Sequence, residues 1–374
     1  MKKLNILAIV PYPFLPPTCG GDYSSMRLFN ALGKQQNVTL FTCEPFSSVA
    51  HLHFDFEMIS YVKFKPQRHI NLFLVYDLLR LIKSKKIDAI FMEQPWFWGM
   101  AFFLKLFSGK PMVMRSNNIE FLRFKSVNKW WWWFLFVYER WCLRGIDYVF
   151  FVTEEDRNRA IKYFGIDEHK TLVTPYGIDR QEPPVDSKHA CELIRARYNI
   201  KQHQRILLFF GSLDYPPNRE ALDVMLKKVL PLLEKDKYVF MVCGRRAQPD
   251  FLAAINGHNH IIHAGFVEDI DHYVMAADVV VNPILSGGGI KTKAVDALAL
   301  NKIVVSTQTG AEGIDPNICG QNLIVISDNN WQAFAEAINI QIDNTPAIPQ
   351  DFYTHFSWKG IAMQMGDKIN ALIK

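Results

Sequence analysis

The chain has 374 residues, 49% hydrophobic and 21% charged, a balance typical of a soluble globular protein with room for two domains. Its formal net charge of +5 favours anionic substrates or an anionic membrane surface and is too small to indicate nucleic-acid binding. The six cysteines are scattered without a CxxC pair, which argues against a zinc ribbon or a disulfide framework and favours a cytoplasmic location.

The chain opens with a short apolar run, Leu4 to Val10, which we interpret as a buried strand and not as a signal peptide. The run ends in Pro11-Tyr12-Pro13, and no small-residue cleavage site follows it. No later window approaches the roughly 20 apolar residues of a membrane span, since Gly99 and Lys105 interrupt the run from Trp96 to Phe107. We therefore expect that the chain does not cross a membrane.

The first half of the chain alternates between strand and helix patterns. Apolar runs predict strands at 4–10, 38–43, 58–64, 87–92, 111–115 and 148–153, and helical spacing predicts helices from near Tyr23 and over 71–82. This alternation predicts a parallel sheet with helices on both faces. Gly20 and Gly21 lie between the first strand and the first helix, where a ligand can approach the backbone closely.

Polar residues follow the predicted strand at 111–115. Ligands of open α/β sheets bind beyond the carboxyl ends of the strands, so Asn117, Asn118 and Glu120 are candidate site residues. The same residues are common caps of turns and helices, and propensity alone does not separate the two interpretations.

An unbroken apolar run, WWWWFLFVY, extends from Trp130 to Tyr138, with lysines before it and Glu139 and Arg140 after it. At helical spacing these residues cover the whole circumference of a helix, which must be buried on both sides or lie against something apolar. Tryptophan beside lysine also suits a membrane interface. A buried helix, an acceptor groove and a membrane contact all stay open.

A polar, proline-bearing stretch at 180–186 marks the predicted domain boundary, after which the alternation starts again. Strands are predicted at 206–210, 238–243, 261–263, 277–281, 303–305 and 322–326. Helices are predicted after Pro216-Pro217-Asn218, over 331–340 and, as an amphipathic final helix, over 358–373.

The stretch from Ser286 to Leu300, SGGGIKTKAVDALAL, has the pattern of a glycine turn and a helix between two strands. Glycines 287–289 let the backbone approach a ligand, and the unpaired N–H groups of the following helix favour an anion there. Lys291 and Lys293 add two cations, so a phosphate would fit. Asp296, on much the same helix face, suits a ribose diol. A plain glycine turn with solvated lysines is the alternative.

Gly211 and Ser212 form a second turn of this kind, after the predicted strand at 206–210. Both turns sit at strand ends with a helix behind them, so both could donate N–H groups to one diphosphate. Two such turns in one domain favour an anion-binding site over a chance glycine pattern more strongly than a single turn does.

Other chemistries lack their motifs. No Walker sequence is present, and GxGxxG spacing is absent near Gly20-Gly21, which weakens ATPase and dehydrogenase interpretations. His258, His260 and His263 flank a predicted strand, so a loop position is favoured over metal binding. Neither a tightly held metal nor a cofactor is predicted.

The second half contains the stretches FFGSLDYPPNREAL (209–222), AGFVEDIDHYVMAADVVVNP (264–283) and SGGGIKTKAVDALALNKIVVSTQTGAEGI (286–314). These stretches resemble the donor-domain signatures of retaining glycosyltransferase family 4, of the GT-B fold. PYPFLPPTCGGD, VTEEDR and TPYGID in the first half are similar to family patterns too. The resemblance spans nearly the whole length.

The resemblance implies two Rossmann-like α/β domains that face each other across a cleft. Residues 1–182 would bind the acceptor, residues 183–357 would bind the nucleotide sugar, and the helix at 358–374 would pack back on the first domain. The implied diphosphate-binding residues are Gly20, Gly21, Gly211, Ser212, Gly287, Gly288, Gly289, Ile290, Lys291 and Lys293. Those implied for the base are Gly244, Arg245, Phe266 and Val267, with Asp296 for the ribose and Lys291, Asn117 and Glu120 for catalysis.

The chain departs from the family pattern at three positions. Gly288 stands where the paired-glutamate motif has an acid, as in a glycine-rich subgroup, and Asp296 replaces the second glutamate. Asn117 stands where the family often has a histidine, and an asparagine can hydrogen-bond a sugar hydroxyl but cannot titrate near neutral pH.

The implied activity is metal-independent transfer of a sugar from a nucleotide-diphosphate sugar, which is a substrate and not a cofactor. The aromatic run and the positive charge suggest a glycan or lipid-linked acceptor at the inner face of the membrane, as in polysaccharide or lipopolysaccharide assembly. Two alternatives stay open: a catalytically silent GT-B scaffold that binds a nucleotide sugar, and a GT-B epimerase acting on the sugar nucleotide itself.

Overall fold

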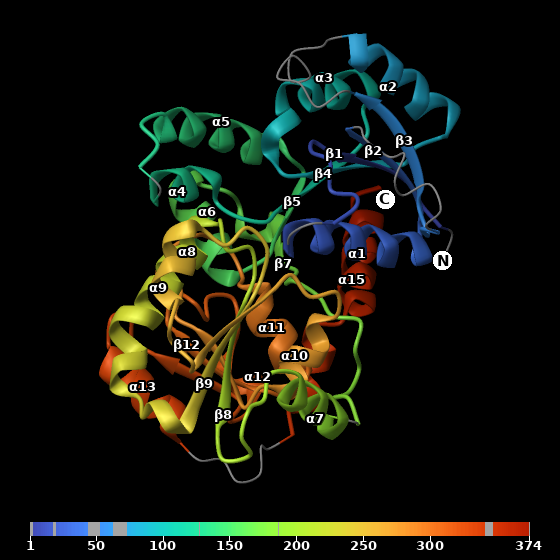
Figure 1. Cartoon of the computed structure of the whole chain (residues 1–374). Helices are drawn as coiled ribbons and strands as arrows, with labels where there is room; N and C mark the ends of the chain where they lie inside the picture. Colours follow the sequence, from blue (N-terminus) through green and yellow to red (C-terminus); the bar gives the residue numbers. More distant parts are fainter. Residues whose placement is uncertain are drawn as a thin grey trace. The chain divides into compact units, whose positions relative to one another are not determined.

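The computed structural model describes residues 3–17, 20–43, 53–62, 73–126, 128–185, 187–340 and 347–373 (Figure 1). The chain divides into two compact units. Unit 1 comprises Met1–Asp179 and Phe356–Lys374, and unit 2 comprises Arg180–His355. Each unit contains one parallel sheet with helices on both faces, as the alternating pattern predicts.

The sheet of unit 1 has the strand order β3-β2-β1-β4-β5-β6-β7, and all neighbouring strands are parallel. The order reverses between β1 and β4, which makes the carboxyl ends of these two strands a topological switch point. The strands are β1 (Asn5–Val10), β2 (Asn37–Cys43), β3 (Glu57–Val62), β4 (Ala89–Glu93), β5 (Met112–Ser116), β6 (Tyr148–Phe151) and β7 (Thr171–Val173).

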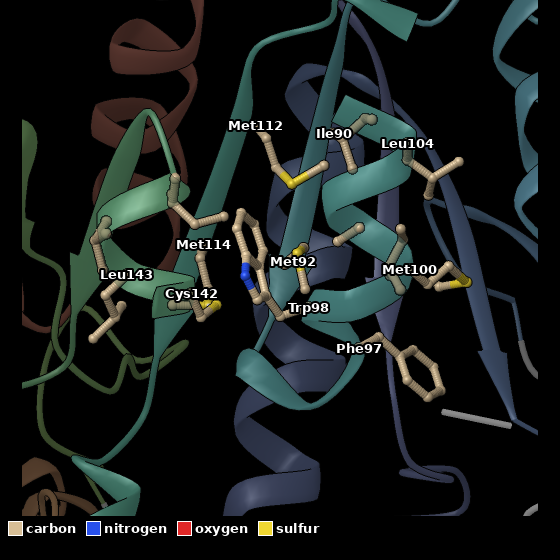
Figure 2. Close-up of a cluster of buried hydrophobic side chains, with 14 of the residues drawn as sticks. Ile90, Met92, Phe97, Trp98, Met100, Leu104, Met112, Met114, Cys142 and Leu143 are labelled. Carbon is tan, nitrogen blue, oxygen red and sulfur yellow. The ribbon is translucent and has the colours of Figure 1, made fainter. Parts of the chain in front are cut away.

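Apolar side chains fill both faces of this sheet. One face is covered by α2 (Phe73–Ser84), α3 (Trp98–Ser108), α4 (Glu120–Ser126), α5 (Trp132–Gly145) and α6 (Glu154–Phe164). Figure 2 shows Trp98 of α3 among Met92, Met114 and Cys142, which come from β4, β5 and α5. Helix α1 (Gly20–Gln35) packs on the other face, where the ring centroids of Phe29 and Phe91 lie 5.4 Å apart.

The last helix, α15 (Trp358–Ile373), belongs to unit 1 and lies beside α1 (Figure 1). The Ile178 N–H donates to the Phe356 carbonyl at 2.6 Å, and the Trp358 N–H donates to the Ile178 carbonyl at 3.2 Å. Trp358 is 2% exposed, and a Cβ on Gly177 would lie 2.3 Å from its ring. Only glycine at 177 therefore leaves room for the indole.

The sheet of unit 2 has the order β10-β9-β8-β11-β12-β13, again all parallel. Its switch point lies between β8 and β11. The strands are β8 (Arg205–Phe210), β9 (Tyr238–Cys243), β10 (Ile261–Gly265), β11 (Val279–Asn282), β12 (Ile303–Thr307) and β13 (Leu323–Ile326). The helices are α7 (Ser187–Arg197), α8 (Pro216–Val224), α9 (Pro249–Ile255), α10 (Ile270–Ala276), α11 (Thr292–Ala299), α12 (Pro316–Cys319), α13 (Trp331–Asn339) and α14 (Gln350–His355).

Two local expectations need correction. Gly20 and Gly21 form the first turn of α1 and not a loop before a helix at Tyr23. The aromatic run is not buried on both sides, because α5 buries only Leu135, Glu139, Cys142 and Leu143 and presents its other face outward. Residues 63–64 and 71–72 of the predicted third strand and second helix lie outside the described residues.

Candidate functional site

Two glycine turns follow the neighbouring strands β8 and β11 of unit 2, at its switch point. Gly211 has a φ of 143°, and Gly287 and Gly289 have φ values of 88° and 69°. These are left-handed conformations that residues with a Cβ rarely adopt. Both turns therefore place backbone groups at the carboxyl ends of the strands, where parallel α/β sheets bind ligands.

Asn218 of α8 joins the first turn to a lysine. Its side-chain Nδ2 donates to the Ser212 carbonyl at 2.8 Å, and its Oδ1 accepts from the Lys293 Nζ at 2.7 Å. Asn218 is buried, and both ends of its amide are satisfied by these two bonds. From the sequence, Asn218 is predicted only to precede a helix; its contact with Lys293, 75 residues later in the chain, has no local signal.

The Lys293 ammonium lies beside the first turn, between the apolar ring of Phe209 and the positive charge of Lys291. Its Nζ is 4.1 Å from the centroid of the Phe209 ring and 3.7 Å from where a Cβ on Gly211 would stand. Although the residue as a whole is only half-buried, the pKa of its ammonium is lowered to about 7, mainly by desolvation and then by the charge of Lys291. A negative ligand at this point would restore the charged form.

Lys291 is the N-cap residue of α11 and folds back over the second turn. Its Nζ donates to the Gly289 carbonyl at 2.7 Å and to the Gly287 carbonyl at 3.4 Å. Gly288 and Ile290 lie in the same turn, and Asp296 is half-buried one helical turn further along α11. Both ammonium groups thus lie within the turns and not in bulk solvent.

The residues predicted to contact a base also gather beside the first turn. The Gly244 N–H donates to the Gly265 carbonyl at 2.8 Å, and a Cβ on Gly244 would lie 2.0 Å from the Gly211 carbonyl oxygen. The Arg245 guanidinium lies 3.6 Å from the centroid of the Phe266 ring, in a cation–π contact, and Phe266 is exposed. Val267 follows directly and is half-buried.

The predicted residues of unit 1 face separate partners. Asn117 Nδ2 donates to Glu93 Oε1 at 2.8 Å, whereas the Glu120 carboxylate accepts from the Arg123 Nε at 2.8 Å. Burial raises the pKa of Glu120 in spite of the opposing effect of Arg123. Glu93, a buried carboxylate at the end of β4, is not among the residues predicted from the sequence.

Metal ligands do not gather in the part of the chain that the structure describes: it contains no group of three or more His, Cys, Asp or Glu residues that could hold an ion. His258 and His260 contact each other ring to ring, and the His263 ring packs on Phe251. The three histidines thus do not form one cluster.

Two family models match this chain. The model described as "Glycosyltransferase Family 4" matches residues 20–182, and the model described as "Glycosyl transferases group 1" matches residues 204–344, so together they cover most of the chain. The chain belongs to glycosyltransferase family 4. The predicted family is thereby confirmed.

This family 4 chain is similar to several known proteins at low identity. A Klebsiella pneumoniae protein described as an uncharacterized 44.6 kDa protein in cps region is 23% identical over 272 residues, which are 67% of this chain and 65% of that protein. A Rickettsia africae ESF-5 glycosyltransferase has a TM-score of 0.76 at 17% identity, over 100% of both chains. Anabaena Alr3699/HepE in complex with UDP has a TM-score of 0.75 at 14% identity, over 98% of this chain and 99% of that one. The predicted GT-B fold class is confirmed.

The structure places the three residues that depart from the family 4 pattern in different surroundings. Gly288 lies between two glycines with positive φ, and a Cβ on the preceding Gly287 would lie 3.1 Å from the Pro217 Cγ. Asp296 lies on α11 beside the lysines, and Asn117 is held by a carboxylate. The catalytic, diphosphate, ribose and base roles remain predictions.

Proposed function

We propose that this family 4 member is a retaining glycosyltransferase that moves a sugar from a nucleotide-diphosphate sugar to a hydroxyl of a glycan or lipid-linked acceptor. One observation carries the proposal: two glycine turns and the ammonium groups of Lys291 and Lys293 converge at the switch point of unit 2. Unit 2 would bind the donor, with Asp296 at the ribose and the Arg245–Phe266 pair at the base, and unit 1 would bind the acceptor.

The chemistry that this geometry suits is departure of a diphosphate. As the bond from the anomeric carbon to the phosphate oxygen breaks, negative charge grows on the leaving group, and fixed positive groups lower that barrier. Turn N–H groups, Lys291 and Lys293 supply such groups. In a retaining transfer the leaving phosphate oxygen can take the proton of the attacking hydroxyl on the same face, so no separate carboxylate base is required.

A donor screen followed by product analysis tests this function. We expect one of the UDP-, GDP- or ADP-sugars to raise the melting temperature, because a ligand at 100 times its Kd stabilises a protein by about 2.7 kcal/mol. With an acceptor extract present, the sugar should be transferred with retention at the anomeric carbon. UDP is the first probe, since a structure of similar fold was solved with UDP.

The same experiment separates the alternatives. A scaffold would bind the donor without converting it, and an epimerase would convert the donor sugar with no acceptor present. Transfer with inversion would contradict the proposed mechanism. Assembly of cell-surface polysaccharide or lipopolysaccharide is the proposed context, supported by the relative in a cps region.

We further propose that unit 1 contacts the inner membrane surface through a two-helix apolar face. This face comprises Phe102, Phe103, Leu106 and Phe107 of α3, together with Trp130, Trp133, Phe134, Val137 and Trp141 on and beside α5, all exposed. It is continuous, because the ring centroids of Phe102 and Trp141 lie 5.7 Å apart. So large an exposed apolar patch usually marks an interaction site.

The charges of the two helices match an anionic bilayer. Helix α3 contains no acidic residue, and the one acid of α5, Glu139, is 1% exposed and accepts the backbone N–H groups of Glu120 and Phe121. Lys129, Arg140 and Arg144 leave the surroundings basic. None of the helices in the described part of the chain has the length and apolarity needed to span a bilayer.

Replacing Trp133, Phe134 and Val137 together by serine should release the protein from vesicles of phosphatidylglycerol and phosphatidylethanolamine. Burial of each of these apolar side chains in the bilayer contributes roughly 1 kcal/mol to the free energy of binding. Loss of all three should therefore lower the partition coefficient on the order of 100-fold. Co-sedimentation measures it. Leu193→Ser with Leu252→Ser, exposed leucines of unit 2, is the matched control and should change nothing. Equal binding by both variants would remove this face from the proposal.

A further inference from the structure

A buried polar network lies at the carboxyl ends of β11 and β12 in unit 2. Its members are Asn282, the last residue of β11, Ser306 and Thr307, the last two residues of β12, and Gly310 in the loop that follows. The three side chains are 0% exposed. None of the four residues is among those predicted for the diphosphate, the ribose, the base or catalysis.

Thr307 joins two loops through one hydroxyl. Its Oγ1 donates to the Ile284 carbonyl and accepts the Gly310 N–H at 3.0 Å. Ile284 is 1% exposed and Gly310 is buried, so solvent is not at hand to replace the hydroxyl. A hydroxyl can donate and accept at the same time, which an apolar side chain of the same shape cannot do. Ile284 opens the short segment that leads from β11 into the second glycine turn.

The loop after β12 is itself held firmly, so Thr307 gives Ile284 a fixed support. Asn282 Nδ2 donates to the Gly310 carbonyl at 2.9 Å and to Ser306 Oγ at 3.0 Å. A Cβ on Gly310 would lie 2.5 Å from Ser306 Oγ and 2.6 Å from the Asn282 carbonyl oxygen, so only glycine lets the network close. On the far side of the loop, the Thr309 N–H and hydroxyl donate to the Asp328 carboxylate at 3.0 and 2.6 Å.

The other side-chain contacts of the second turn lie nearer the solvent. Ser286 Oγ donates to Glu220 Oε2 at 2.7 Å in an exposed contact. The Lys291 ammonium donates to carbonyls of the turn itself, so it follows the turn and does not fix it. Water competes for exposed hydrogen bonds, whereas a buried bond cannot be exchanged without leaving both partners unpaired. The bond from Thr307 to Ile284 therefore determines where the turn leaves β11.

The first glycine turn has a separate support. Asn218 Nδ2 donates to the Ser212 carbonyl at 2.8 Å, and its Oδ1 accepts from Lys293. A change at Thr307 should therefore move the second turn and Lys291 while the first turn and Lys293 stay in place. This separation distinguishes a positioning role from a general loss of stability.

We propose that Thr307 is a positioning residue for the second glycine turn, whose buried hydroxyl holds Ile284 and thereby the turn N–H groups and the Lys291 ammonium where the donor diphosphate binds. The inference rests on the proposed transferase function and adds to it a residue that does not touch the donor.

Calorimetry and saturation-transfer NMR test this role without turnover. The probes are UDP, GDP and ADP, with uridine, guanosine and adenosine as the matching ligands that lack the diphosphate. Thr307→Val keeps the shape of the side chain but leaves the Ile284 carbonyl and the Gly310 N–H unpaired. We expect it to weaken binding of the preferred diphosphate about tenfold and to leave binding of the nucleoside unchanged. Thr307→Ser keeps the hydroxyl and should restore the affinity.

Two further measurements exclude a merely structural effect. Ser306→Ala removes the neighbouring buried hydroxyl and leaves both Thr307 bonds in place, so it should lower the melting temperature without weakening diphosphate binding. In a double-mutant cycle, Thr307→Val with Lys291→Ala should lose clearly less affinity than the two single losses multiplied together, because both changes act on the same turn. The pH dependence that Lys293 gives to binding of the nucleotide sugar should persist in Thr307→Val.

The inference is wrong if Thr307→Val binds the diphosphate as the wild type does, if it loses nucleoside binding equally, or if Ser306→Ala has the same effect. Should Thr307→Val not fold, Thr307→Cys takes its place, since a thiol of similar size is a weaker donor. A wild-type protein that binds none of the diphosphates would remove the site and with it the role of Thr307. Failure of the transferase function alone would show differently, as the expected pattern of binding without sugar transfer.

Discussion

Replacing Lys291 by alanine should lower sugar transfer by about 100- to 1,000-fold, the usual effect of removing one preorganised group that stabilises transition-state charge. The Lys291 ammonium lies over the second glycine turn, on the Gly289 and Gly287 carbonyls, where a leaving diphosphate would sit. The loss should fall on kcat, because the charge of the leaving group grows in the transition state. Release of nucleoside diphosphate measures it.

Lys227→Ala is the control for this variant. Lys227 lies just after α8, is 70% exposed in its side chain and pairs with Asp223, so transfer should be unaffected by its loss. The melting temperature of Lys291→Ala should stay near that of the wild type. Wild-type turnover by Lys291→Ala would show that the second turn does not hold the leaving group.

Donor affinity should fall about tenfold for each pH unit above about 7, because Lys293 must then take up a proton on binding. Its pKa is lowered from 10.5 to about 7 by desolvation, and a diphosphate beside it would raise the pKa again. Below pH 7 the ammonium is already charged and affinity should level off. A nucleotide sugar is the right probe, since its diphosphate is esterified at both ends and does not titrate there.

Two variants and one melting curve check the sign of this linkage. Lys293→Met should bind weakly and without a pH slope, at a cost of about 1.5–3 kcal/mol at pH 6. Lys293→Arg keeps its proton and should bind equally at pH 6 and pH 9.

For the free protein the folded state binds fewer protons than the unfolded state between pH 7 and 10.5, so Lys293 should make stability rise with pH, opposite to donor affinity. A pH-independent donor Kd in the wild type would refute the assignment.

The strands and glycine turns could be predicted because their determinants are local. Short apolar runs mark β8, β11 and β12 within one or two residues, and amphipathic spacing marks α15 from Trp358 to Ile373. The outward face of α5 could not be predicted, because WWWWFLFVY has no polar side. Which side packs depends on α3, some 30 residues earlier in the chain, and on the sheet beneath.

The same distinction between local and long-range determinants applies to the candidate site residues. The two lysines and the glycines lie in short contiguous stretches, so their chemistry was visible in sequence. Asn218 and Glu93 act through partners far away in the chain, with Lys293 and Arg115 being 75 and 22 residues from them. Such juxtapositions follow from strand order, and a single sequence carries no direct signal for them.

The assignment of α15 to unit 1 bears on how this polypeptide matures during synthesis. Residues 180–355 form a continuous segment and can complete their core as soon as they leave the ribosome. Unit 1 cannot complete its core at that stage, because Gly177 is synthesised before this segment and Trp358, which packs against Gly177, is synthesised after it. The N-terminal half therefore spends the whole translation of its neighbour with an unfilled indole pocket, and nascent-chain truncations before residue 358 should leave it exposed to chaperones and proteases.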